Sequence, residues 1–155
     1  MGLGGAASRS SNAMPKRQKQ RRDYLVFISH ASKDKWVANQ MAKLIGAAGR
    51  TGGVKVFLDE KDIHGGDSIP EAIRTNLRSC DELVVLLTRN SISREWVLVE
   101  IAGAWVLGKR VVAIMDQVTP KELPDVIANC RAVDLNDFDT YLADVKLRAR
   151  KSRAV

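Results

Sequence analysis

Continuous apolar runs, each followed by a polar stretch, organise the chain. These runs are Tyr24–Ser29, Val54–Leu58, Leu83–Leu87, Val111–Met115 and Arg131–Leu135. Short runs without polar alternation are typical of strands buried on both faces of a sheet. The segments between the runs carry apolar residues at helical spacing, so helices are expected to alternate with the strands. This pattern predicts an α/β fold in which helices cover both faces of a five-stranded parallel sheet.

The segment after the third run predicts a helix with an unusual carboxylate. Ser93 is the expected N-cap and Gly108 the expected stop, and Glu100 is the only polar residue between Trp96 and Leu107. A helix this apolar should be largely buried, and a buried carboxylate is costly unless it is used or paired. Trp96 lies one turn earlier on the same face, so its indole and the carboxylate are expected to line one pocket.

A second interpretation gives this segment only a structural role. Glu100 would then reach the rim of the helix, or pair with a lysine or arginine of a neighbouring element, and Trp96 would be ordinary core. Topology favours a functional role, because ligands of open parallel sheets bind beyond the carboxyl ends of the strands. The loops 29–32, 59–66 and 88–92 are expected to meet there, and Glu100 lies about two helical turns from the last of them.

Composition and charge predict a single globular domain with basic ends. The chain has 155 residues, of which 45% are hydrophobic, and a formal net charge of +7. Eleven of its 25 lysines and arginines, but no acid, lie outside residues 23–145. We therefore expect an expression-tag remnant at 1–13, a disordered basic arm at 14–22, a domain at 23–145 and a basic tail at 146–155. The acidic balance within the domain predicts no specific nucleic-acid partner.

Other sequence signals exclude several classes of protein. Cys80 and Cys130 have neither metal-ligand spacing nor a signal peptide, which favours reduced thiols in a cytoplasmic protein. No apolar run reaches the length of a membrane span. The sequence has no metal-ligand cluster, phosphate-binding loop or GxSxG motif, so we expect no metal and no resident cofactor.

Four motifs in order resemble a TIR (Toll/interleukin-1 receptor) domain of the bacterial kind. They are VFISHASKDK at 26–35, VFLD at 56–59, GDSI at 66–69 and WVLVE at 96–100. The resemblance covers roughly residues 23–145 and implies a flavodoxin-like fold with strand order 2-1-3-4-5. This expectation agrees with the alternation of strands and helices. The chain departs from the family at Leu25, where many members carry aspartate, and it lacks the C-terminal Phe-Trp motif of animal adaptors.

The resemblance implies two kinds of function, because some TIR domains cleave NAD+ and others only assemble with partners. In the cleaving kind, the positions of Glu100 and Trp96 hold the catalytic glutamate and the tryptophan before it. His30 and Ala31 match the loop that approaches the dinucleotide, and Asp59 matches the end of the second strand. The Glu60–Ser68 loop matches the family's self-association loop. NAD+ is then a substrate, and a separate sensor or effector protein is a further expected partner.

One carboxylate suffices for this reaction. Most glycoside cleavage needs a second carboxyl group to protonate the leaving oxygen. Nicotinamide leaves the ribose of NAD+ as a neutral base, so no general acid is required. An ionised Glu100 would stabilise positive charge at the anomeric carbon or capture it covalently, and Trp96 would stack on the base. Because burial opposes ionisation, we expect an opening toward water or a hydroxyl partner.

The leading hypothesis is thus an NAD+ nucleosidase that yields nicotinamide and ADP-ribose or a cyclic ADP-ribose isomer. The family context points to bacterial antiphage signalling or NAD+ depletion. One alternative is a non-catalytic TIR interaction module in which Glu100 is structural. Another is a nucleoside-processing enzyme such as a deoxyribosyltransferase, which also combines a flavodoxin-like fold with a glutamate nucleophile.

Overall fold

The computed structural model describes residue 1 and residues 22–50, 52–58 and 71–154, apart from the side chain of Ala72. Its strands are β1 (Tyr24–Ser29), β2 (Val54–Leu58), β3 (Glu82–Leu87), β4 (Arg110–Met115) and β5 (Arg131–Asp134). They form a five-stranded sheet in the order β2-β1-β3-β4-β5, and every neighbouring pair is parallel. The predicted flavodoxin-like fold is confirmed.

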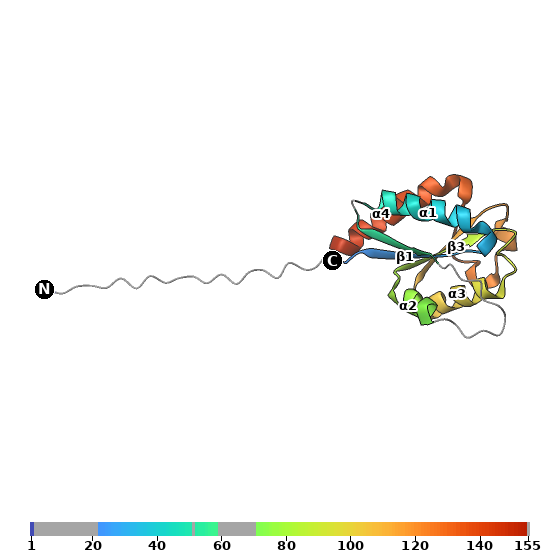
Figure 1. Cartoon of the computed structure of the whole chain (residues 1–155), viewed down its shortest axis with the longest axis horizontal. Helices are drawn as coiled ribbons and strands as arrows, with labels where there is room; N and C mark the ends of the chain where they lie inside the picture. Colours follow the sequence, from blue (N-terminus) through green and yellow to red (C-terminus); the bar gives the residue numbers. More distant parts are fainter. Residues whose placement is uncertain (2–21, 51, 59–70, 155) are drawn as a thin grey trace.

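Helices cover both faces of the sheet (Figure 1). The helices α1 (Lys35–Ala48) and α4 (Phe138–Ala154) lie on one face, and α2 (Glu71–Ser79) and α3 (Glu95–Val106) lie on the other. Short 3-10 segments occupy Ser32–Asp34, Pro120–Glu122, Asp125–Ile127 and Leu135–Asp137. Since the strands are parallel, their carboxyl ends share the edge of the sheet at which α1 and α3 begin.

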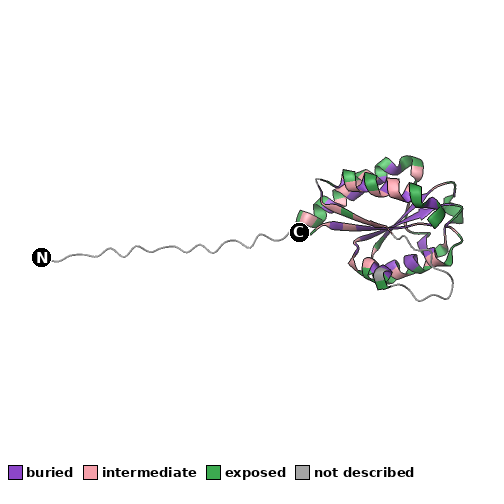
Figure 2. Ribbon diagram, in the orientation of Figure 1, coloured by how far each residue is buried: buried purple, intermediate pink, exposed green. Residues whose placement is uncertain are grey.

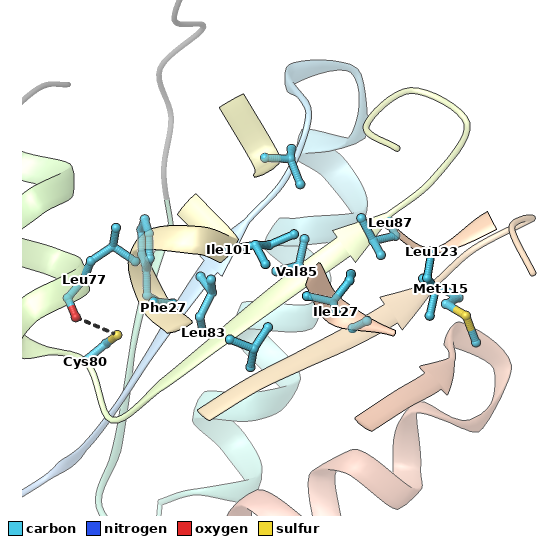
Figure 3. Packing of buried hydrophobic residues seen from close by; sticks show 14 of the residues in the cluster. Phe27, Leu77, Cys80, Leu83, Val85, Leu87, Ile101, Met115, Leu123 and Ile127 are labelled. Atoms are coloured by element: carbon cyan, nitrogen blue, oxygen red, sulfur yellow. Dashed lines mark hydrogen bonds between the residues drawn. The ribbon is translucent and has the colours of Figure 1, made fainter. Parts of the chain in front are cut away.

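The central strands are buried on both faces, as their continuous apolar sequence predicts (Figure 2). Alternate side chains of β1 and β3 enter different cores. Phe27 and Val85 belong to the core beneath α2 and α3, whereas Ile28 and Val84 belong to the core beneath α1 and α4. Figure 3 shows the first core, in which Ile101 of α3 lies close to Val85 of the sheet. Complete burial of such a side chain contributes about 1.5–3 kcal/mol.

The predicted ends of α3 are confirmed at one end and wrong at the other. Gly108 ends the helix with a positive φ of 64°. The Gly108 amide donates to the carbonyl of Trp105, and the Lys109 amide donates to the carbonyl of Ala104, both at 2.9 Å, which forms a Schellman motif. At the start, Arg94 is the N-cap instead of Ser93, and its side chain makes no capping hydrogen bond. The residues before it form turns, in which the Ser91 amide donates to the Thr88 carbonyl and the Arg94 amide donates to the Ser91 carbonyl. The helix therefore begins after these turns.

The last helix continues through the predicted C-terminal tail. Residues 146–154 are helical, so the domain does not end at Val145 as the charge pattern suggested. The buried residues of this helix are Phe138, Tyr141, Val145 and Ala149, and they recur at helical spacing. The charge count alone did not reveal this spacing, because basic residues flank Ala149 on both sides. The basic residues of α4 therefore belong to the folded domain.

A buried ion pair fixes α4 to the sheet. Arg148 donates from Nε and Nη2 to the two oxygens of Glu82, at 2.8 and 2.9 Å, and Glu82 is 0% exposed. The hydroxyl of Tyr24 donates to Glu82 Oε2 at 2.9 Å. The guanidinium of Arg148 also lies 5.8 Å from the ring centroid of Tyr141. This network lies at the amino edge of the sheet, where β3 begins, far along the strands from the start of α3.

Among residues 22–50, 52–58 and 71–154, no helix is both long and apolar enough to cross a membrane.

Candidate active site

Glu100 and Trp96 form a hydrogen-bonded pair on α3. Glu100 is 1% exposed, so it lies on the buried side of the helix and does not reach the rim. The Trp96 indole Nε1 donates to Glu100 Oε1 at 3.0 Å, and the indole is half-buried. The spacing of four residues brings the two side chains together over one turn. Apolar residues of the same helix, Val97 and Ile101, pack into the core and hold this face against the sheet.

The pair lies on the wall of a cavity of about 380 Å³ between α2 and α3. Apolar side chains form most of the lining, which comprises Ile73, Arg74, Leu77, Arg78, Trp96, Val99, Glu100, Ala102, Gly103, Val106 and Leu107. The cavity extends along the two helices toward their carboxyl ends, so it is not confined to the carboxyl edge of the sheet as expected. Gly103 contributes to this space, since a Cβ there would lie 3.4 Å from Leu77 Cδ1.

The other predicted site residues lie near the carboxyl edge or outside the described ranges. His30 and Ala31 directly follow β1, and Ala31 is buried, with its carbonyl accepting from the Asp34 amide at 2.8 Å. Neither of them is among the described residues that line the cavity. Asp59 and the Glu60–Ser68 loop lie outside the described residues, as does the expected cap of α2 at Asp67 or Ser68. The structure thus brings Glu100 and Trp96 together, and it places His30 and Ala31 at the strand end.

A buried aspartate that the sequence did not single out ties two loops of this edge together. Asp34 accepts from Thr88 Oγ1 at 2.6 Å and from Asn90 Nδ2 at 2.7 Å. It precedes α1 but makes no side-chain cap, because its carboxylate faces the loop after β3. The loop that carries His30 is therefore fixed to the turn that leads into α3. Nothing in the sequence pattern distinguishes this aspartate, except that it stands directly before α1.

Ser29 adds a second polar group that the sequence analysis did not weigh. It ends β1 on the face that carries Phe27, which is the face covered by α3, and it is almost fully buried. Its hydroxyl forms no hydrogen bond with any described residue. As for metals, no group of three or more His, Cys, Asp or Glu side chains within the described ranges is arranged to hold an ion.

Several curated proteins are similar to the chain. A 2′ cyclic ADP-D-ribose synthase of Acinetobacter baumannii is 27% identical over 137 residues, which is 81% of this chain and 50% of that protein. An NAD(+) hydrolase of Escherichia coli is 30% identical over 121 residues, which is 78% of this chain and 36% of that protein. A probable 2′ cyclic ADP-D-ribose synthase of Brachypodium distachyon is 27% identical over 128 residues, which is 79% of this chain and 56% of that protein. The chain therefore spans about half the length of these relatives, or less.

Among solved structures, the TIR domain of the Toll-related receptor TRR-2 from Hydra magnipapillata has a similar fold. Its TM-score is 0.57 at 20% identity, covering 83% of this chain and 97% of that one. A CMP N-glycosidase of Clostridium botulinum has a TM-score of 0.51 at 15% identity, covering 79% and 98%. At these identities the likeness extends to the fold alone.

The sheet order and the glutamate–tryptophan pair on α3 define a flavodoxin-like α/β domain with a candidate site on the helix after the third strand. The TIR domain family model matches residues 26–146. The chain belongs to the TIR domain family.

Proposed function

We propose that this TIR domain is an NAD+ nucleosidase that cleaves the bond between nicotinamide and ribose. The observation that carries the proposal is the buried Glu100, whose carboxylate is held by Trp96 on the wall of a cavity. The similar proteins of Acinetobacter baumannii and Escherichia coli, named as a cyclic ADP-ribose synthase and an NAD(+) hydrolase, support the same activity. The products are nicotinamide and either ADP-ribose or a cyclic ADP-ribose isomer.

In this mechanism the carboxylate acts on the sugar. The bond from the anomeric carbon to the pyridinium nitrogen breaks, and its electron pair leaves with the nitrogen, which becomes neutral. Glu100 stabilises the positive charge that develops on the anomeric carbon. The indole N–H of Trp96 fixes the carboxylate orientation before the reaction, so little reorganisation is needed. Water then attacks the carbon to give ADP-ribose, or a nucleophilic atom of the same molecule attacks it to give the cyclic product.

The remaining contacts of the substrate belong to the same proposal. His30, Ala31 and Asp59 are proposed to contact the dinucleotide from the carboxyl ends of β1 and β2. Asp34 positions the first of these loops through its hydrogen bonds to Thr88 and Asn90. NAD+ is the substrate in this scheme, and no further cofactor takes part.

The test is to incubate the protein at high concentration with NAD+ and to resolve the products by chromatography and mass spectrometry. Glu100→Gln keeps the size of the side chain but removes its charge, so release of nicotinamide should fall by at least about a hundredfold. Glu95→Gln, an exposed change on the same helix, is the matched control and should retain activity. Thermal unfolding of both variants separates loss of chemistry from loss of fold.

The outcomes separate the candidate functions. If Glu100→Gln folds normally and still releases nicotinamide, the catalytic role is wrong. If NAD+ survives with the wild-type protein at every concentration, a non-catalytic TIR interaction module is the better description. Release of free base from deoxynucleosides, with NAD+ left intact, would instead indicate the deoxyribosyltransferase alternative.

Self-association is proposed to accompany the activity. The Glu60–Ser68 loop is the proposed contact, and a separate sensor or effector protein is a proposed partner, in bacterial antiphage signalling or NAD+ depletion. If assembly completes the site, the specific activity should rise with protein concentration. Variants of the loop should then lose activity in dilute solution first.

A further inference from the structure

Basic side chains gather at the amino edge of the sheet, opposite the edge where α3 begins. We call this set the basic edge; it comprises Arg22, Arg50, Lys55, Arg78, Lys109, Arg110, Arg150, Lys151 and Arg153. Figure 1 shows why residues from both ends of the sequence meet there, since the end of α4 lies beside the start of β1. The charge pattern predicts a tail for several of these residues, but 146–154 are helical, so their charges belong to the domain.

Acidic side chains neutralise only part of the basic edge. Asp81 pairs with Arg22, and Asp23 pairs with both Lys55 and Arg153. Glu82 is buried and already bound by Arg148, which is not counted in the set. Within residues 22–50, 52–58 and 71–154, the other six members form no ion pair; these are Arg50, Arg78, Lys109, Arg110, Arg150 and Lys151. A net positive face therefore remains after internal pairing.

Helix dipoles explain some of these charges but not all of them. Basic residues in the last turn of a helix interact favourably with its carboxyl end, which accounts for Arg78, Lys151 and Arg153. Arg110, in contrast, begins a β-strand, whereas Arg50 directly follows the C-cap of α1 and so also lies at a helix carboxyl end. A helix dipole gives no reason for cations at the starts of strands. Arg110 and the exposed Arg150 therefore add positive charge to this edge that no helix end accounts for.

Three large apolar side chains border the same edge. Trp105 is 68% exposed and Val106 is 76% exposed, and Leu107 is also exposed. They end α3, and the turn at Gly108 leads directly to Lys109 and Arg110. Exposed aromatic and aliphatic side chains beside basic ones are the pattern of proteins that lie on a lipid surface. The phosphate backbone of a nucleic acid would be matched by the cations but offers no comparable apolar layer for this cluster.

We propose that the basic edge and the apolar cluster of Trp105, Val106 and Leu107 form a docking surface for an anionic lipid bilayer. The basic side chains contact lipid phosphates and carboxylates, and the apolar cluster enters the interfacial layer between headgroups and acyl chains. Each basic side chain held near such a surface strengthens binding about fivefold. The carboxyl edge, which carries His30 and the first turn of α3, faces the aqueous phase in this orientation. Because Arg78, Val106 and Leu107 also line one end of the cavity between α2 and α3, docking covers that end and leaves the end at Trp96 toward the aqueous phase.

The first experiment measures binding of the full chain to vesicles by flotation. Vesicles of phosphatidylcholine with about 30% phosphatidylserine should bind the protein at 100 mM salt, and pure phosphatidylcholine vesicles should not. Raising the salt to 500 mM should release it, because screening weakens exposed charge interactions. The double variant Arg150→Glu with Lys151→Glu should bind at least tenfold more weakly. The control is Lys33→Glu with Lys121→Glu, which changes the net charge equally at exposed sites near the carboxyl edge and should bind as wild type.

Tryptophan fluorescence tests the apolar contact separately. Entry of Trp105 into the lipid interface should shift the emission to shorter wavelength when phosphatidylserine vesicles are added. Trp105→Phe should abolish the shift. Trp36→Phe should preserve it, because Trp36 is also exposed, at 73%, but lies at the start of α1 near the opposite edge. These surface variants should keep the wild-type circular dichroism spectrum.

Three results would overturn the proposal. The first is equal binding to both kinds of vesicle, or to neither. The second is an equal loss of binding in the two charge-reversal variants, which would indicate net charge instead of a specific surface. The third is salt-sensitive binding to a DNA duplex by the basic edge without binding to phosphatidylserine vesicles, which would assign the surface to nucleic acid. None of these results depends on whether the domain cleaves NAD+.

Discussion

Arg148→Met tests the conclusion that α4 belongs to the domain. Arg148 supplies both guanidinium hydrogen bonds to Glu82, which is fully buried. Methionine keeps much of the apolar volume over Tyr141 but leaves a buried carboxylate with a neutral donor, Tyr24. Removal of one partner of a buried ion pair typically costs about 3–5 kcal/mol. For a domain of this size that loss corresponds to a decrease in Tm of roughly 10–15 °C.

The assay is urea and thermal unfolding of the variant beside Arg150→Met, an exposed change on the same helix. Arg150→Met should alter the free energy of unfolding by less than about 0.5 kcal/mol. The double variant Glu82→Gln with Arg148→Met removes the charge from both sides and should recover at least half of the loss. The reasoning fails if Arg148→Met costs no more than Arg150→Met, or if the two changes of the double variant simply add.

Other predictions follow from the buried polar groups. Burial, with the nearby charge of Glu82, raises the pKa of Tyr24 and of Tyr141, so their proton is held more tightly in the folded state than in the unfolded state. Their stabilising contribution is complete below about pH 10 and is lost as the pH rises from there, and phenolate absorbance should therefore appear together with unfolding in an alkaline titration. Burial raises the pKa of the Cys80 thiol to about 11, so iodoacetamide at pH 8 should label the partly buried Cys130 first. Peptide mass spectrometry measures the labelling of each cysteine, and faster labelling of Cys80 would contradict this prediction. Asp34→Ala should lower the free energy of unfolding in urea by about 1–3 kcal/mol, and a wild-type stability would refute the link between the two loops. If Asp34→Ala also loses NAD+ cleavage, Asp34→Asn should recover part of that activity.

The fold was predictable because it is encoded in short local patterns. Continuous apolar runs identified the strands within about one residue, from Tyr24–Ser29 to Val111–Met115, and Gly108 marked the end of α3. Features set by tertiary contacts were not predictable in this way. The extent of α4 depends on what Arg148 meets across the sheet, and a charge count cannot show that partner.

The same distinction applies to the candidate site. The one-turn spacing between Trp96 and Glu100 is local, so their contact could be predicted from the helix alone. The role of Asp34 could not, since Thr88 and Asn90 are more than fifty residues away in the sequence. The cavity is also a tertiary feature, because it depends on how α2 lies beside α3 and on the missing side chain at Gly103.

The two buried glutamates show why burial by itself does not identify a functional carboxylate. Glu82 and Glu100 are both almost inaccessible, and each occupies an apolar element. Glu82 accepts two hydrogen bonds from a guanidinium, which neutralises its charge and uses it to fix α4. Glu100 accepts an indole N–H and lies on the wall of a cavity, so a cationic group of a ligand can approach it. Substitution should distinguish them in the same way, since loss of the Glu82 charge with Arg148 retained lowers stability, whereas Glu100→Gln leaves the fold intact and removes the chemistry.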